Sequence, residues 1–134
     1  MSKSLIQVAN PSSQTVALNG IIDLGSTQRR FGCNCRLSGN GIEVDGAGYY
    51  AIDASVSVAP TVAGPVTVAI YKDGVQIPGA IASDSVSTAN SPSNVAINTT
   101  IRLGCNCESA DNLTLVLLAG AGVVQNVSMR VIKE

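Results

Sequence analysis

The sequence contains no histidine and no tryptophan, and its aromatic residues are one phenylalanine and three tyrosines among 134 residues. Histidine is the side chain that most often acts as a general base or binds a transition metal. Without it, no serine–histidine pair for nucleophilic catalysis can form. So few aromatic rings also disfavour a site that binds bases or sugars by stacking. These absences predict a protein that is not an enzyme and that has no cofactor, apart from a zinc alternative considered below.

Charge is scarce as well. Charged residues make up 13% of the chain and the net charge is −1, whereas an average protein has about 25%. The one adjacent basic pair, Arg29-Arg30, is interpreted as part of a solvated loop, and no basic stripe predicts nucleic-acid binding. The longest apolar run, Leu113–Ala121, is too short to span a bilayer, so no membrane partner is expected. The first residues lack the apolar segment of a signal peptide, which predicts synthesis in the cytosol.

What the sequence does contain is alternation of apolar and polar residues with a period of two. This pattern is typical of strands with one face in a core and the other in water. The expected inward residues are Tyr50, Ile52, Ala54, Val56 and Val58; Val95, Ile97, Thr99, Ile101 and Leu103; Leu113, Leu115 and Leu117; and Val127, Met129 and Val131. Because adjacent strand residues face opposite ways, Tyr50 is predicted to lie in the core and Tyr49 on the surface or at a subunit contact.

Turn residues separate these runs. Asp73-Gly74 between two apolar segments predicts a hairpin, and Asn19-Gly20, Asn40-Gly41 and Asp45-Gly46 mark further turns. Eight to ten short strands at this spacing predict an all-β antiparallel sandwich or jelly roll. Residues 1–13 are polar enough to predict a flexible N-terminal arm, which leaves residues 14–134 as a single jelly-roll domain.

All four cysteines occur in two copies of Gly-Cys-Asn-Cys, at Cys33 and Cys35 and at Cys105 and Cys107. If the two segments pair antiparallel in register, Cys33 faces Cys107 and Cys35 faces Cys105, and two cross-strand disulfides could form. The same four thiolates could instead hold one Zn²⁺, although zinc sites more often use a Cys-x₂-Cys spacing. In the third interpretation all four are reduced, small, partly buried residues.

Acidic residues offer one further candidate. Glu43 and Asp45 are the only close pair that could share a strand face and bind a cation such as Ca²⁺. A solvated sheet edge is the favoured interpretation of this pair, and Asp45 also fits the role of a turn residue before glycine.

Several segments resemble the tumour-necrosis-factor and complement-head superfamily in order and spacing. They are QTVALNGIIDLG from Gln14, GAGYYAIDASVSV from Gly46, VTVAIYKDGVQI from Val66, NTTIRLGCNCESADNLTLVL from Asn98, and VSMRVIK from Val127. The resemblance is to the bacterial and phage members, such as the C-terminal heads of collagen-like spore-surface proteins and small phage virion modules. It implies a ten-stranded jelly roll that assembles as a tight trimer. No Gly-x-y collagen stalk is present.

The function predicted from these observations is structural. A homotrimer would bury part of the apolar 46% of the chain in a closed arrangement. The resemblance implies a component of a phage virion, made in the bacterial cytosol, that decorates a capsid or attaches a fibre or tail, with a capsid or fibre protein as partner. The alternative is a receptor- or glycan-binding module of a phage fibre or spore surface, which would use the loops predicted at Ser83–Asn94 and Gly120–Asn126.

Overall fold

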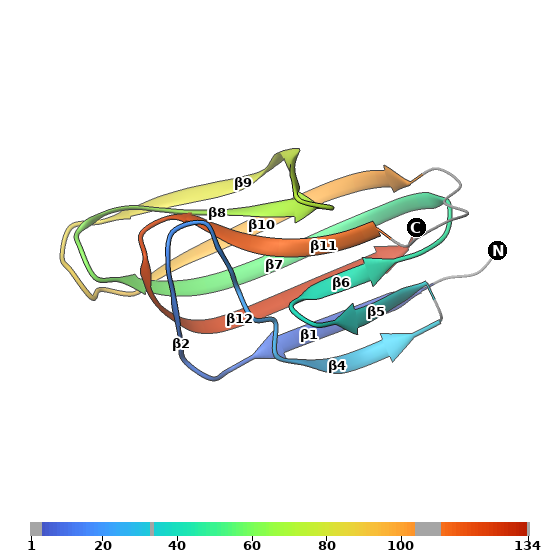
Figure 1. Cartoon of the computed structure of the whole chain (residues 1–134), viewed down its shortest axis with the longest axis horizontal. Coiled ribbons are helices and arrows are strands. Elements are labelled where there is room, and N and C mark those ends of the chain that lie inside the picture. Colours follow the sequence, from blue (N-terminus) through green and yellow to red (C-terminus); the bar gives the residue numbers. More distant parts are fainter. Residues whose placement is uncertain (1–3, 33, 104–110, 134) are drawn as a thin grey trace.

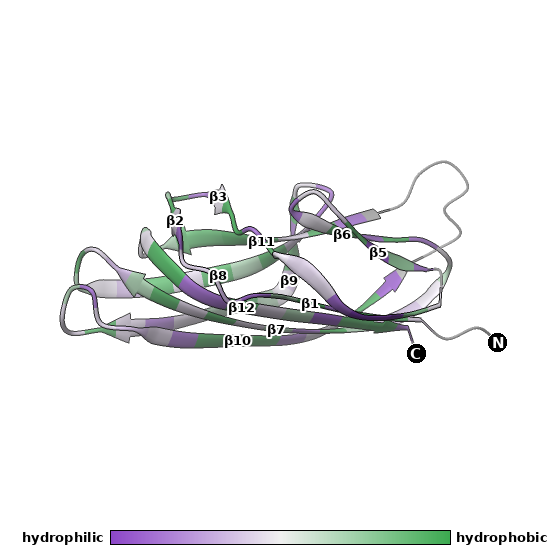
Figure 2. Ribbon diagram, turned by 90° about the horizontal axis from the view of Figure 1, so that it is seen from below, coloured by the Kyte–Doolittle hydropathy of each residue, from purple (hydrophilic) through white to green (hydrophobic). Residues whose placement is uncertain are grey.

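The computed structural model describes residues 4–32, 34–103 and 111–133. These residues form twelve strands in two antiparallel six-stranded sheets and contain no helix. The two sheets lie face to face with the core between them (Figures 1 and 2). The predicted all-β antiparallel jelly roll is therefore confirmed. The two strands beyond the expected ten are the short β2 (Gln14–Val16) and β3 (Gly20–Ile21).

Sheet A has the strand order β10-β7-β12-β1-β4, and β2 pairs with the first residues of β12. Its strands are β10 (Ser93–Leu103), β7 (Gly48–Pro60), β12 (Gly122–Lys133), β1 (Leu5–Asn10) and β4 (Ser26–Phe31). Sheet B has the order β5-β6-β11-β8-β9, and β3 pairs with β11. Its strands are β5 (Cys35–Ser38), β6 (Gly41–Val44), β11 (Asp111–Ala119), β8 (Gly64–Lys72) and β9 (Val75–Val86).

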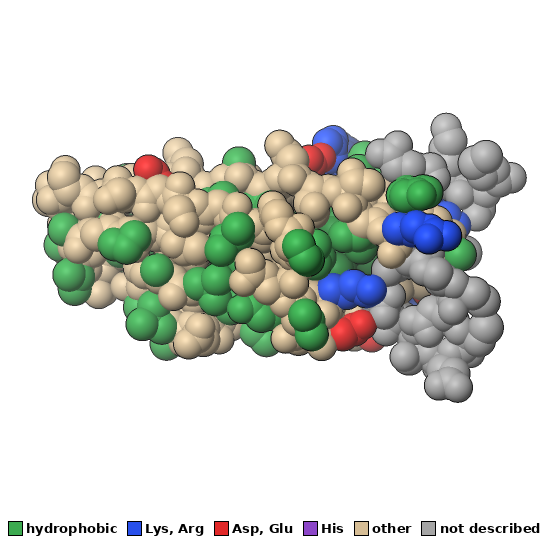
Figure 3. Space-filling model, turned by 90° about the horizontal axis from the view of Figure 1, so that it is seen from above, with side chains coloured by type: hydrophobic (Ala, Val, Ile, Leu, Met, Phe, Trp, Pro, Cys, Tyr) green, Lys and Arg blue, Asp and Glu red, His purple; other side chains and the backbone are tan. Residues whose placement is uncertain are grey.

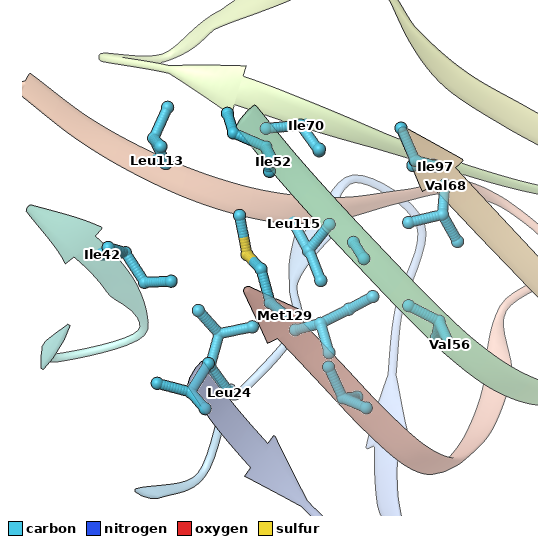
Figure 4. Packing of buried hydrophobic residues seen from close by; sticks show 14 of the residues in the cluster. Leu24, Ile42, Ile52, Val56, Val68, Ile70, Ile97, Leu113, Leu115 and Met129 are labelled. Atoms are coloured by element: carbon cyan, nitrogen blue, oxygen red, sulfur yellow. The ribbon is translucent and has the colours of Figure 1, made fainter. Parts of the chain in front are cut away.

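The core lies between the sheets and is built from the predicted alternating residues. Ile52 of β7, Leu115 of β11 and Met129 of β12 are fully buried and lie together in Figure 4. The colouring of Figure 2 shows the same alternation along the strands. Tyr50 is 0% exposed and Tyr49 is 55% exposed, so the prediction for this pair is confirmed. Burial of branched aliphatic side chains from both sheets is the main stabilising term for this fold.

The N-terminal segment is a strand in the described structure, and the expectation of a flexible arm over residues 1–13 is wrong for Leu5–Asn10. These residues form β1, which pairs with β12 on one side and with β4 on the other. Ile6 and Val8 are fully buried. The apolar alternation of so short a segment was hidden by the polar residues around it. The folded domain therefore begins at the start of the described chain.

The Asp73-Gly74 hairpin forms as predicted. Lys72 and Val75 are paired across the turn, and Asp73 and Gly74 have φ values of 51° and 83°. Two positive φ values in a two-residue loop are those of a type I′ turn, which matches the twist of the strands it joins. No helix long and apolar enough to cross a membrane occurs in the described part of the chain.

Candidate functional site

The candidate surface is the outer face of sheet A, which points away from the core. Its strands are in register, so that side chains from five strands line up in rows across the sheet. The row nearest the termini is apolar except for one threonine. It consists of Phe31, Leu5, Ile132, Ala51 and Thr100, from β4, β1, β12, β7 and β10. Phe31 is 65% exposed, which leaves a large apolar ring on the edge strand without a cover.

The next row is polar, and its two central charged residues are paired with each other. It consists of Arg29, Gln7, Arg130, Asp53 and Asn98. The Arg130 guanidinium donates to the Asp53 carboxylate at 2.5 Å, and the Asn98 amide, in its better orientation, donates to the same carboxylate. Both ion-pair partners keep substantial exposure, so the pair contributes little to the stability of the fold. Its position in the middle of the face suits it better to orienting a partner surface.

The following rows carry small side chains. One consists of Ser26, Ala9, Ser128, Ser55 and Ala96, and the next of Asn126, Ser57 and Asn94. The Ser57 hydroxyl donates to the Asn94 side-chain oxygen within the second of these rows. Between the polar and the small rows lies a surface cavity of about 310 Å³. Side chains this short let a flat partner surface approach the backbone closely.

The cysteine segments are only partly described. Cys35 lies in β5, opposite Val44 of β6, and its side chain is buried. Burial raises its pKa from 9.0 to about 11, against the smaller opposite effects of Arg30 and Lys133. Cys33, Cys105 and Cys107 lie outside the described residues. Both disulfide pairings and the four-thiolate zinc site therefore stay predictions.

The asparagine between the first two cysteines has a role that the sequence analysis missed. The Asn34 side chain accepts a hydrogen bond from the Ser4 hydroxyl at 2.7 Å and donates to the Asp45 carbonyl at 2.5 Å. The Tyr50 hydroxyl donates to the carbonyls of Asp45 and Gly46 at 3.0 and 2.8 Å. These bonds join the N-terminus, the start of β5 and the turn before β7. The sequence analysis noted the Asp45-Gly46 turn, but nothing in the sequence indicated that Asn34 would hydrogen-bond to it.

The acidic pair does not converge on a cation site. The Glu43 carboxylate accepts from the Arg36 guanidinium at 2.5 Å across the β5–β6 ladder, whereas Asp45 takes part through its backbone carbonyl. Within residues 4–32, 34–103 and 111–133, no three metal-binding side chains cluster. This arrangement corresponds to the solvated sheet edge favoured from the sequence.

Strands extend into both predicted loop regions, which corrects the expected bounds of the loops. Residues up to Val86 belong to β9 and residues from Ser93 to β10, so the loop between them is short. β12 begins at Gly122. Arg29 and Arg30 also lie on a strand, β4, and the Arg30 Nε donates to the Cys35 carbonyl at 2.8 Å. Alternation failed there because all six residues of this edge strand are exposed.

Comparison with known proteins identifies the fold. No protein-family model and no curated protein matches the sequence. Among solved structures, murine APRIL matches with a TM-score of 0.76 and 10% identity over 99% of this chain and 100% of that one. PRD1 vertex protein P5 matches with a TM-score of 0.70 and 16% identity over 97% and 96% of the two chains.

The globular domain of a zebrafish complement 1qA protein matches with a TM-score of 0.70 and 9% identity, over 96% of this chain and 94% of that one. At such identities the likeness concerns the fold, and it extends over nearly the whole length of each partner. The chain therefore has a jelly-roll fold like that of murine APRIL, PRD1 vertex protein P5 and the complement 1qA globular domain.

Proposed function

We propose that the protein is a non-enzymatic structural component of a phage virion, which assembles as a homotrimer and decorates a capsid or attaches a fibre or tail. The likeness to PRD1 vertex protein P5 over nearly the full length of both chains supports this proposal. At 16% identity that likeness concerns the backbone alone, so the case for assembly rests on the surface of this chain.

The outer face of sheet A is the surface through which the copies pack. Its central rows carry serine, alanine and asparagine, and its charges at Arg130 and Asp53 are paired with each other. Burying such a face costs little desolvation, because no unpaired charge is left at its centre. The apolar row at its end, which includes Phe31, supplies the hydrophobic gain. A closed symmetric assembly covers this row in every copy.

Light scattering tests the assembly. We expect a mass three times that of the 13.6 kDa subunit. Ser55→Lys places an ammonium group in the middle of the outer face of sheet A, and it should dissociate the trimer because the charge would be buried without a partner. Ser85→Lys makes the same change at an exposed position of β9 in sheet B and should leave the mass unchanged. A monomeric wild-type protein, or equal behaviour of the two variants, would contradict the proposal.

A second experiment addresses the place of the protein in the particle. Fluorescently labelled protein is mixed with virions that lack it and, separately, with host cells, and each mixture is sedimented. Saturable binding to the particles supports a decoration or attachment role. Binding to the cells alone would refute that role and favour the receptor-binding alternative.

A further inference from the structure

A cleft of about 590 Å³ lies between the edge strand β9 of sheet B and the edge strand β10 of sheet A. Its residues come from the end of β8, the start of β9 and the end of β10, so both sheets contribute. Figure 3 shows Lys and Arg side chains gathered toward the right-hand end of this side of the molecule, with none on its left half. A cleft of this size is in the range of small-molecule sites.

An irregularity in β9 shapes the cleft. Along the β8–β9 ladder, Tyr71 pairs with Gln76, and the next regular pair is Ala69 with Ile81. Ile70 therefore stands opposite residues 77–80, which form a wide bulge. Pro78 has no backbone N–H to offer to a ladder, and Gly79 has a φ of 82°. Figure 1 shows β9 bending sharply near this end.

The bulge makes one wall of the cleft. It brings Ile77 and Pro78 to the cleft beside Val75, and Ile101 of β10 lines it as well. A regular strand here would instead continue the ladder and leave these residues along the sheet edge. Bulges are enriched beside binding and catalytic sites because they re-aim side chains in this way. The interruption of an otherwise regular hairpin thus produces an apolar wall next to charged groups.

The charged groups of the cleft are Arg102, Lys72 and Asp73. The Asp73 carboxylate already accepts the backbone N–H of Asn112 at 2.9 Å. The Arg102 guanidinium is exposed, and no ion pair joins it to another residue of the described ranges. A guanidinium presents a planar fork of donors that fits a carboxylate in two parallel hydrogen bonds. Arg102 is therefore the group through which the cleft can bind an anion.

We propose that this cleft binds a small organic carboxylate with an apolar body. The carboxylate takes two hydrogen bonds from the Arg102 guanidinium. The apolar body lies against Val75, Ile77 and Pro78. The cleft shares Thr100 with the end row of the sheet A face, but no residue of the central rows lines it, and the proposal holds whether or not the protein is part of a virion.

Fluorine NMR of the full chain tests the site with 6-fluoro-2-naphthoate as the probe. We expect saturable binding, and binding of the corresponding neutral amide that is at least ~10-fold weaker, because the amide cannot pair with a guanidinium. Arg102→Gln should weaken binding of the acid by at least ~10-fold. The matched control is Arg36→Gln, which makes the same change at an exposed position of β5 in sheet B and should leave the affinity unchanged.

A second variant tests the apolar wall. Val75 is 70% exposed, so Val75→Asp should fold normally, which circular dichroism checks, while it repels the carboxylate and weakens binding of the acid. The proposal would be overturned if no saturable binding occurs up to about 5 mM probe. Equal affinities of the acid and the amide would overturn it too, as would an equal loss in the Arg102 and Arg36 variants.

Discussion

Removal of the Tyr50 hydroxyl group tests how much its hydrogen bonds to the turn before β7 stabilise the fold. The ring of Tyr50 is fully buried, and its hydroxyl donates to the carbonyls of Asp45 and Gly46 at 3.0 and 2.8 Å. Tyr50→Phe removes this hydroxyl and keeps the ring. The substitution therefore isolates the hydrogen bonds from the packing of the aromatic ring.

The expected loss of unfolding free energy is about 1–2 kcal/mol. A typical intramolecular hydrogen bond contributes about 1 kcal/mol net, and an acceptor left without a partner adds to the cost. The Asp45 carbonyl keeps its bond from the Asn34 side chain, so the stranded acceptor is the carbonyl of Gly46. Because Gly46 is only half-buried, water can reach that carbonyl, which limits the loss to the stated range.

Urea denaturation at a fixed subunit concentration measures this loss, since assembly would make stability depend on concentration. The control is Tyr49→Phe, which makes the same chemical change one residue away, on a side chain that is 55% exposed. This control should change the free energy by less than about 0.5 kcal/mol. Equal losses in the two variants, or none in Tyr50→Phe, would refute the role assigned to the buried hydroxyl.

The pH dependence of the same pair gives an independent check. Burial, with smaller contributions from Cys35 and Asp45, raises the pKa of Tyr50 from 10.0 to about 12. The folded state thus prefers the protonated phenol, so this contribution to stability is complete below pH 10 and is lost as the pH rises toward 12. We expect the stability difference between the wild type and Tyr50→Phe to shrink over this interval. A difference that stays constant would contradict the assignment.

Two further predictions concern the cysteine segment and the turns. Cys35 should react with iodoacetamide much more slowly in the folded protein than in urea at pH 8, as measured by peptide mass spectrometry, because it is buried and its pKa is about 11; equal rates would contradict this. Gly25→Ala should lower the melting temperature more than Gly39→Ala does. Both glycines have positive φ, but only at Gly25 would the new Cβ lie 2.4 Å from the Ala9 carbonyl oxygen, and equal shifts would refute the clash.

Much of the fold could be predicted because a strand with one buried face alternates apolar and polar residues in the sequence. The alternation from Tyr50 to Val58 and from Leu113 to Leu117 matches the buried residues of β7 and β11. The type I′ turn at Asp73-Gly74 follows from the backbone preferences of its two residues. These features are local, since each depends on which face of one strand meets the core or on one turn.

The candidate sites could not be predicted in the same way, because they depend on which strands become neighbours. The row that contains Leu5, Ile132 and Ala51 combines residues from the two ends of the chain and from its middle. The cleft depends on Arg102 of one sheet and Ile77 of the other lining the same hollow, and on a bulge in β9 that the sequence analysis did not predict.

The sequence by itself determined the all-β class, the inward face of the long strands, the hairpin at Asp73-Gly74 and the burial of Tyr50 rather than Tyr49. Only the tertiary structure decided that β1 is a strand within sheet A, that Cys35 faces Val44, and that Asn34 ties the N-terminus to the turn before β7. The physical reason is that alternation and turn preference act between near neighbours. Strand order and register, in contrast, minimise the free energy of the whole core at once.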